Sequence, residues 1–451
     1  MMPENKTIIK LIAFLLFFQQ VGNAQEIKTN YSLQEALDYA LSNNQEGKNA
    51  RLDMEISDRQ VGEIMAAGLP QLNARANIDY NYALRRTFLD TADAFFPLPP
   101  DLNSNTVGFA LGVPYSGFFG ATLDQMIFDG AFIIGVKAAK TLKELTRKDN
   151  IRTNIEIREA VSKAYFGVLV NRERYLLIER NFTRVDSLLI DTKLLHQNGF
   201  SEKIDVNRVQ VQYNNLKVEL ENYQSIVDLS LSILKFQMGL DLRQPLELSD
   251  AIQDIDYFDF ELAKNFNYDR RIEYSQMNIR KELNQLDIKN VKSQYIPTLD
   301  LVASYGKNTG ALALGEVFSN EWFSTGMVGI RASVPLFDGL RKRRIVQQRK
   351  LEAEKIENQF DQLRYNIDIE IQQSLANYNR EIERIKAQEE NMELAREVFD
   401  VATLKYKEGV GSNIEVIEAD ASYKEAQTNY YNALYDALIS KIDLQKAYGV
   451  L

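Results

Sequence analysis

The sequence predicts a mainly α-helical protein that also supplies β-strands to a membrane, built as a tandem repeat. Three observations lead to this fold class. Short stretches alternate apolar and polar residues, as strands with one apolar face do. Long stretches lack glycine and proline and repeat apolar residues every three or four positions, as helices do. The same landmarks occur in both halves of the chain, in the same order.

The first segment, residues 1–24, is predicted to be a secretory signal peptide. Lys6 and Lys10 flank a short apolar stretch at 11–18, and small residues lead to a cleavage site after Ala24. A membrane-spanning helix needs about 20 apolar residues, and this stretch is shorter. Because no other segment reads as a transmembrane helix, we expect an exported chain that spans a membrane with strands.

Two structural repeats are predicted after the signal peptide, at 25–246 and 247–451. Corresponding landmarks are separated by 209 or 210 residues in the second part of each repeat. The paired landmarks are Phe128-Asp-Gly130 and Phe337-Asp-Gly339, Gly199 and Gly409, Gly239 and Gly449, and Pro70 and Pro297. Such self-similarity indicates a duplicated fold.

The first repeat is predicted to hold a β-hairpin at about 70–128. Even positions after Pro70 are apolar and odd positions are polar over about eleven residues, which is the period of a strand. We expect Val107–Val113 to begin the second strand. The extra residues of this hairpin include Phe95–Pro100, whose prolines are typical of a loop.

The second repeat is predicted to hold the matching hairpin at about 297–337. Alternate residues are apolar from Leu299 to Tyr305 and again from Val328 to Leu336. A tilted membrane-spanning strand needs about 9–11 residues, so these stretches are long enough to cross a bilayer.

The rest of the chain is predicted to be helical. Residues 340–408 contain neither glycine nor proline and could form a helix about 100 Å long. Narrow apolar stripes indicate helices that pack as in a coiled coil. Ser32 and Glu35 form a capping box that begins the first mature helix. Gly199 and Gly409 are expected to reverse the chain at the tips of two long helical hairpins.

The composition excludes several classes of function. The chain has no cysteine and one histidine, His196, so metal and thiol sites lack ligands and a serine hydrolase would depend on that histidine alone. A net charge of −10 argues against nucleic acid as a partner. We therefore expect no enzyme, no cofactor and no bound metal.

Four strands cannot close a barrel, and unpaired strand edges are not tolerated in lipid. The strands of several chains must therefore combine. The residues alone do not decide between eight strands from a dimer and twelve from a trimer. The long helices also need neighbours on both sides, which a closed ring of helices supplies.

The order of these elements resembles the TolC-type outer-membrane efflux proteins, the outer membrane factor family. The resemblance covers 25–451 and is most specific at 334–339, 406–419 and 444–449. It implies a homotrimer with a twelve-stranded barrel in the outer membrane of a Gram-negative bacterium and a helical barrel in the periplasm. It also implies three further partners: a periplasmic adaptor (membrane fusion) protein, an inner-membrane transporter and outer-membrane lipid.

The function implied by the resemblance is that of an exit duct in a tripartite efflux or type I secretion system. Such a duct passively conducts drugs, metals or polypeptides, and its partner supplies the energy. The alternative is an exported coiled-coil adaptor or scaffold of the cell envelope. That alternative explains the helices but not two alternating hairpins at equivalent repeat positions.

Two acidic residues after the second tip, Glu415 and Glu418, correspond to the residues that narrow the periplasmic end of the pore in the family. Residues three apart share one face of a helix, so threefold symmetry would make two acidic rings that favour cations. The alternative is an ordinary solvated helix face, which the spacing alone favours.

The resemblance also implies a gate latch between Asp205 and Tyr406, which match the family's aspartate after the first tip and tyrosine before the second. The family's arginine two residues beyond the second tip glycine is Gly411 here, so an ionic part of the latch is absent or built differently. The two tips are the expected adaptor-docking surface as well as inter-helix turns. Their residues are Gly199, Phe200, Ser201, Gly409, Val410, Gly411 and Ser412.

Overall fold

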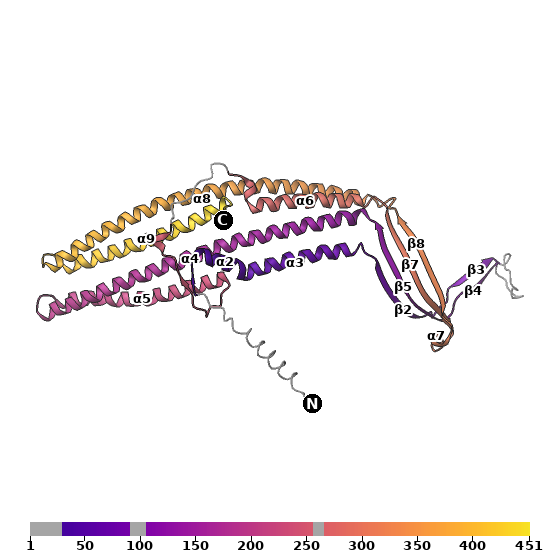
Figure 1. Cartoon of the computed structure of the whole chain (residues 1–451), viewed down its shortest axis with the longest axis horizontal. Coiled ribbons are helices and arrows are strands. Elements are labelled where there is room, and N and C mark those ends of the chain that lie inside the picture. The colour runs from indigo at the N-terminus through magenta and orange to yellow at the C-terminus, as the bar shows by residue number, and fades with distance from the viewer. Residues whose placement is uncertain (1–28, 91–104, 256–265) are drawn as a thin grey trace, which may run out of the picture. The chain divides into compact units, whose positions relative to one another are not determined.

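The structure is a computed structural model that describes residues 29–90, 105–255 and 266–451 (Figure 1). The expected signal peptide and the expected loop Phe95–Pro100 lie outside the described residues. The described chain is mainly helical and includes a four-stranded antiparallel sheet, as the sequence predicts.

The elements follow one another in the order β1 (Asn30–Tyr31), α2 (Leu33–Asn43), α3 (Gln45–Ala66), β2 (Gln71–Tyr80), β3 (Arg86–Asp90), β4 (Thr106–Ala110), β5 (Tyr115–Phe128), α4 (Gly130–Gln197), α5 (Lys203–Met238), β6 (Glu247–Leu248), η2 (Ile252–Asp254), η3 (Tyr268–Arg270), α6 (Ile272–Ser293), β7 (Thr298–Ala311), α7 (Glu316–Ser319), β8 (Phe323–Ser333), α8 (Arg341–Lys407) and α9 (Asn413–Ala447).

The chain divides into two compact units. The helical unit contains the described residues up to Asp53 together with Lys148–Gln276 and Phe360–Leu451. The strand unit contains Met54–Arg147 and Met277–Gln359. Each unit takes segments from both halves of the chain, so neither unit is one of the predicted repeats. The repeats 25–246 and 247–451 stay a prediction.

The main sheet of the strand unit has the strand order β2-β5-β7-β8. The predicted second strand of the first hairpin was wrong: Val107 lies in β4, which pairs with β3 in a separate two-stranded sheet. The strand that pairs with β2 is β5. Gly112, at φ 131°, and Pro114 interrupt the alternation that began at Val107.

Glycines in β5 explain why its sequence does not alternate. Gly120 lies opposite Gly306 of β7, and a Cβ added at Gly120 would come 2.8 Å from the Gly306 Cα. The two backbones therefore approach more closely than any side chain permits. In the second hairpin, β8 ends at Ser333, although the apolar alternation continues to Leu336. Ser333 pairs with Thr298, the first residue of β7, so β7 offers no further partner.

Two long helical hairpins contain the longest helices of the described chain. The glycine- and proline-free stretch at 340–408 forms α8, which has 67 residues, and α9 follows with 35. In the first hairpin α4 has 68 residues and α5 has 36. Both reversals use a glycine at positive φ, 82° at Gly199 and 75° at Gly409. No helix among the described ranges contains a stretch apolar enough to cross a lipid bilayer.

The main core of the helical unit gathers α2, α4, α5 and α9 around the paired strands β1 and β6. The Tyr165 hydroxyl is fully buried and donates a hydrogen bond to the Tyr31 carbonyl at 3.0 Å. Ser32 and Glu35 form the predicted capping box at the start of α2. β1 and α2 are thereby fixed to the first helical hairpin.

Candidate channel wall and helical tip

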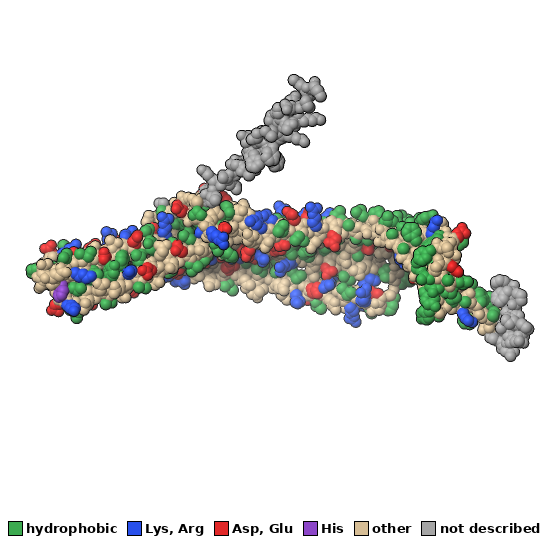
Figure 2. All heavy atoms as spheres, turned by 90° about the horizontal axis from the view of Figure 1, so that it is seen from below, with side chains coloured by type: hydrophobic (Ala, Val, Ile, Leu, Met, Phe, Trp, Pro, Cys, Tyr) green, Lys and Arg blue, Asp and Glu red, His purple; other side chains and the backbone are tan. Residues whose placement is uncertain are grey.

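One face of the main sheet is largely apolar across all four strands. Directly opposed residues share a face, so the register sorts the side chains into two sets. Several apolar side chains are largely exposed, among them Val328 at 78%, Leu72 at 72% and Ile330 at 71%. Figure 2 shows hydrophobic side chains gathered over the strands. The polar residues Gln125, Lys307, Thr309 and Ser324 also lie on this face. Its apolar side chains are Leu72, Ala74, Ala76, Ile78, Tyr80, Tyr115, Phe119, Ala121, Leu123, Leu299, Leu301, Ala303, Tyr305, Val328, Ile330 and Ala332.

The opposite face of the sheet is largely polar. It carries charged and amide side chains together with a few apolar ones, and the Arg75 guanidinium lies 5.5 Å from the centre of the Phe118 ring. Its polar members are Asn73, Arg75, Asn77, Asp79, Thr122, Asp124, Asp300, Ser304, Asn308 and Arg331. One polar and one apolar face is the pattern of strands that separate lipid from an aqueous lumen.

The sheet has two open edges. Within the described residues, β2 pairs only with β5 and β8 pairs only with β7. An open edge presents unpaired backbone N–H and C=O groups, which lipid cannot satisfy. The wall is therefore incomplete in a single chain.

The acidic pair of the second tip shares one side of α9. Glu415 and Glu418 are both exposed, and both line a groove of about 490 Å³ between α8 and α9. Ser412 caps α9: its hydroxyl accepts from the Glu415 N–H at 3.3 Å and lies 3.2 Å from Glu415 Oε1. The two carboxylates thus share a face, while their role in a pore stays a prediction.

The predicted latch residues do not contact each other within the described residues. Asp205 accepts hydrogen bonds from the Ser201 hydroxyl and the Glu202 N–H, both at 3.3 Å, and lies 3.4 Å from Arg208. Tyr406 packs against a buried cluster of Phe399, Val416 and Ala419. The latch stays a prediction.

The tips expose two large apolar side chains, Phe200 at 81% and Val410 at 79%. His196 Nδ1 lies 2.8 Å from the Ser201 carbonyl oxygen, so the histidine supports the turn itself. In the described part of the chain, no cluster of His, Asp or Glu could hold a metal ion.

A buried ionic contact near the tip is not predicted by the sequence. Arg184 of α4 donates from Nε to Asp420 Oδ1 of α9 at 3.1 Å, and Gln212 of α5 donates to Asp420 Oδ2 at 2.7 Å. The guanidinium also lies 4.5 Å from the centre of the Phe399 ring of α8. We call these four residues the Arg184 clasp, which links four helices.

The signal for the clasp was a polar residue in a buried stripe. Asp420 falls four positions after Val416 in α9, and both side chains are buried. A carboxylate at such a position needs a cation, but its partner lies 236 residues away in the chain. Spacing alone cannot identify a partner at that distance.

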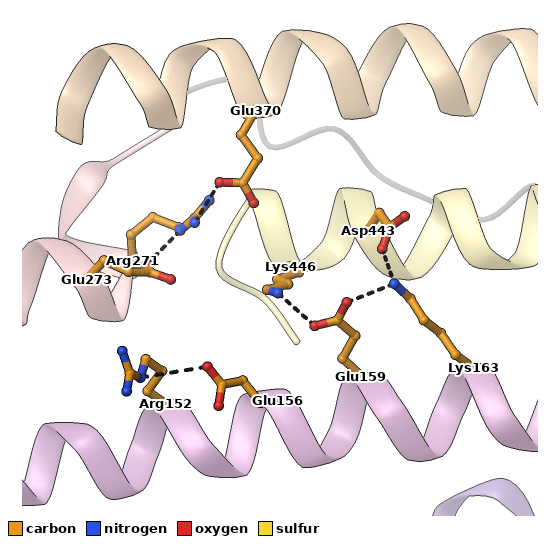
Figure 3. Close-up of polar contacts among 9 residues, drawn as sticks. All are labelled: Arg152, Glu156, Glu159, Lys163, Arg271, Glu273, Glu370, Asp443 and Lys446. Atoms are coloured by element: carbon orange, nitrogen blue, oxygen red, sulfur yellow. Dashed lines mark hydrogen bonds and ion pairs between the residues drawn. The ribbon is translucent and has the colours of Figure 1, made fainter. Parts of the chain in front are cut away.

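A second ionic cluster joins α4 to the end of α9 (Figure 3). Glu159 lies between two lysines, 2.7 Å from the Nζ atoms of Lys163 and Lys446, and Lys163 also lies 2.6 Å from Asp443. Burial opposes the ionisation of Glu159, but the two lysine hydrogen bonds outweigh it and hold its pKa below the usual value. Glu159 is therefore charged at neutral pH.

Arg271 holds the C-terminal end of α9 in the same region, because its buried guanidinium donates to the Ala447 carbonyl at 2.9 Å. It also donates to Glu370 of α8 at 2.8 Å and to Glu273 of α6 at 3.0 Å (Figure 3). Burial would raise the pKa of Glu273, but Arg271 lowers it overall. A cation at the C-terminus of a helix also complements the helix dipole.

The two-faced strands and the paired helical hairpins define an outer-membrane channel protein. A family model described as "Outer membrane efflux protein" matches residues 270–450. Outer membrane protein TolC of Escherichia coli is 22% identical over 439 residues, covering 93% of this chain and 82% of TolC. The alkaline protease secretion protein AprF of Pseudomonas aeruginosa is 22% identical over 312 residues, covering 66% of this chain and 58% of AprF.

Solved structures share the fold. The open state of the Neisseria gonorrhoeae MtrE outer membrane channel matches with a TM-score of 0.72 at 16% identity, covering 92% of this chain and 88% of that one. In sequence and in fold the chain is similar to the TolC family of outer membrane efflux proteins. Proteins of this family are channels rather than enzymes, and they extend from the outer membrane into the periplasm.

Proposed function

We propose that this chain forms the exit duct of a tripartite efflux or type I secretion system. Three copies would combine their strands in a twelve-stranded barrel and their hairpins in a periplasmic tube. The observation that carries the proposal is the main sheet, which has an exposed apolar face, a polar face and two open edges. The duct would conduct drugs, metals or polypeptides passively, with an adaptor and an inner-membrane transporter as partners.

The function can be tested in the native bacterium by deleting the gene. A duct for efflux or secretion predicts a protein in detergent-extracted outer membranes, and either raised sensitivity to expelled compounds or a lost secreted polypeptide after deletion. Restoring the gene should restore the phenotype. A water-soluble periplasmic protein would instead support the coiled-coil adaptor or scaffold, which does not account for the exposed apolar sheet.

We also propose that Glu415 and Glu418 form acidic rings at the narrow end of the tube. Their exposure on one side of α9 supports this, since threefold symmetry would multiply each carboxylate. The double change of Glu415 and Glu418 to Gln should lower cation preference and block by divalent ions in single-channel recordings. Glu389 and Glu390, exposed on α8, make a matched control pair. An equal loss of cation preference and divalent block in both double variants would contradict the acidic rings.

The latch is proposed as a contact made in the closed trimer. Asp205 lies in the first turn of α5 and Tyr406 in the last turns of α8, so both are beside the tips. Asp205→Ala should raise closed-state conductance and antibiotic sensitivity, whereas Asp228→Ala, farther along α5, should not. Unchanged conductance in Asp205→Ala would contradict the latch.

The tips themselves are proposed to dock the adaptor. The exposed Phe200 and Val410 supply apolar contacts of the kind that bury well at an interface. Changing both residues to Ser should abolish co-purification with the adaptor while the trimer remains intact. An unaffected complex would place the docking surface elsewhere.

A further inference from the structure

A groove between α4 and α6 is lined mainly by lysine and amide side chains. Its volume is about 390 Å³, and the buried Leu286 forms part of its lining. Three of the polar lining residues are lysines and one is a glutamate. These polar residues are Lys137, Asn278, Lys281, Glu282, Gln285 and Lys289. The groove therefore carries more positive than negative charge.

The groove lies close to the strands. α4 follows β5 directly and α6 leads into β7, and the two strands pair with each other (Figure 1). The Asn290 side chain of α6 donates to the Ala131 carbonyl of α4 at 2.9 Å, which holds the two helices together beside the strands. Lys137 and Lys289 each lie about two helical turns from the neighbouring strand. The groove is therefore at the level where strands give way to helices.

Two of the three lysines in the groove have no carboxylate partner within the described residues. Lys281 pairs with Glu357 of α8 at 2.7 Å. Lys137 and Lys289 are exposed and form no ion pair in the described part of the chain. Lysine binds phosphate oxygens as a compact positive charge. The groove therefore offers two ammonium groups to an anion.

Exposed apolar side chains lie between these lysines and the strands. Ile133 is 55% exposed and lies one turn before Lys137, on the same face of α4. Ile296 is 47% exposed and lies in the turn between Lys289 and β7. A Cβ added at Gly130 would lie 3.7 Å from Ile296 Cδ1, so this side chain reaches the start of α4. Apolar residues followed by lysines, in the direction away from the strands, are typical of a membrane interface.

We propose that the groove between α4 and α6 binds the headgroup of an anionic phospholipid in the periplasmic leaflet of the outer membrane. Lys137 and Lys289 would bind the phosphate oxygens, and the acyl chains would contact Ile133 and Ile296. This inference rests on the proposed function, because that function places the strands in the outer membrane and the helices in the periplasm. The bound lipid would fix the depth at which the sheet sits in the bilayer.

An anionic lipid accounts for both parts of this surface. A free phosphate ion would use the lysines but leave Ile133 and Ile296 in water, and a zwitterionic lipid brings no net negative charge to the lysines. Two further lysines at this level, Lys140 of α4 and Lys292 of α6, are also exposed and without an ion pair in the described ranges. They extend the positive charge beside the groove.

Native mass spectrometry of the complex extracted from outer membranes tests the site, with short-chain phosphatidylglycerol and phosphatidylcholine as probes. The native chain should bind phosphatidylglycerol more tightly than phosphatidylcholine. A lysine near an anionic lipid strengthens binding about fivefold, so Lys137→Gln with Lys289→Gln should weaken phosphatidylglycerol binding roughly 25-fold. The control is Lys193→Gln with Lys217→Gln, two exposed lysines of α4 and α5 without an ion pair in the described residues. The control should bind phosphatidylglycerol as the native chain does.

Inorganic phosphate in tenfold excess should leave the bound phosphatidylglycerol in place, and displacement by phosphate would overturn the lipid as the occupant. Equal binding of the two lipids to the native chain, or unchanged phosphatidylglycerol binding in the Lys137 and Lys289 double variant, would also overturn the inference. These results leave the proposed duct intact, because they come from a complex extracted from outer membranes. A water-soluble periplasmic protein would overturn both the lipid site and the duct.

Discussion

Single residues near the tip determine how firmly the two helical hairpins are joined. Asp420 has a side chain 7% exposed and accepts hydrogen bonds from both Arg184 and Gln212. Between this contact and the tips, no polar side-chain contact joins the two hairpins within the described residues. The clasp is therefore the last polar link before the tips. Removing one member of a buried ion pair leaves the other charge without compensation, which costs about 3 kcal/mol.

Asp420→Asn should therefore lower the stability of the helical hairpins markedly, since it keeps the shape of the side chain and removes its charge. Thermal unfolding, followed by the far-ultraviolet circular dichroism of the helices, measures this loss of stability. Asp436→Asn is the matched control, because Asp436 pairs with Arg384 and its side chain is 46% exposed. Equal melting of the two variants would contradict a stabilising role for the clasp.

The Glu159 cluster makes a pH-dependent contribution. Because the folded-state pKa of Glu159 is below its ordinary value, its stabilisation is present above the unfolded pKa of about 4.3 and is lost as the pH falls through the folded pKa. Glu159→Gln should thus destabilise the protein at pH 7 and make progressively less difference in acid. Urea unfolding midpoints of the variant and the native chain, measured from about pH 7 to about pH 3, test this pH dependence.

A control for this titration lies one turn away on the same helix. Glu156 pairs with Arg152 at 3.7 Å, and its side chain is 50% exposed, so Glu156→Gln should change the urea midpoint little at any pH. A constant difference between Glu159→Gln and the native chain at all pH values would contradict the assigned cause.

At the scale of elements, the sequence predicted long helices better than strands. The stretch 340–408 was predicted helical and α8 spans Arg341–Lys407, because no glycine or proline interrupts it. The alternation after Pro70 likewise identified β2. By contrast the start of the second strand was predicted too early, at Val107 instead of Tyr115, since the glycines of β5 serve a close backbone approach to β7 that only the paired structure reveals.

The candidate site was predictable to the same extent. Local spacing placed Glu415 and Glu418 on one side of α9, as the structure has them. The contacts of Asp205 and the partner of Asp420 depend on segments far apart in the chain, which no local pattern specifies. Elements follow from local sequence, whereas contacts between elements follow from packing.

Gly306 makes a prediction for the strand element. A Cβ there would lie 2.7 Å from the Phe119 carbonyl oxygen and 3.0 Å from the Gly120 Cα, both backbone atoms that cannot move aside. Gly306→Val should therefore separate β5 from β7 and abolish the folded protein in outer membranes. Gly329→Val in β8, where nothing lies within 4 Å, should fold normally. Yields after detergent extraction and unheated electrophoresis compare the two; equal yields would contradict the close approach.

At the scale of the whole molecule, the absence of cysteine and the single histidine agree with a channel that performs no chemistry. One chain supplies four strands of the wall, and both outer edges remain open within the described residues. A barrel wide enough for a lumen needs more than about eight strands. The function therefore depends on how many copies join.

The most direct measurement of this central claim is the mass of the complex extracted from outer membranes, by native mass spectrometry in detergent. We predict three copies of the mature chain, so that twelve strands enclose a lumen. A complex of two copies would supply only eight strands, and side chains nearly fill the interior of an eight-stranded barrel. A single copy would leave both edges of the sheet open. Either result would contradict the proposed duct.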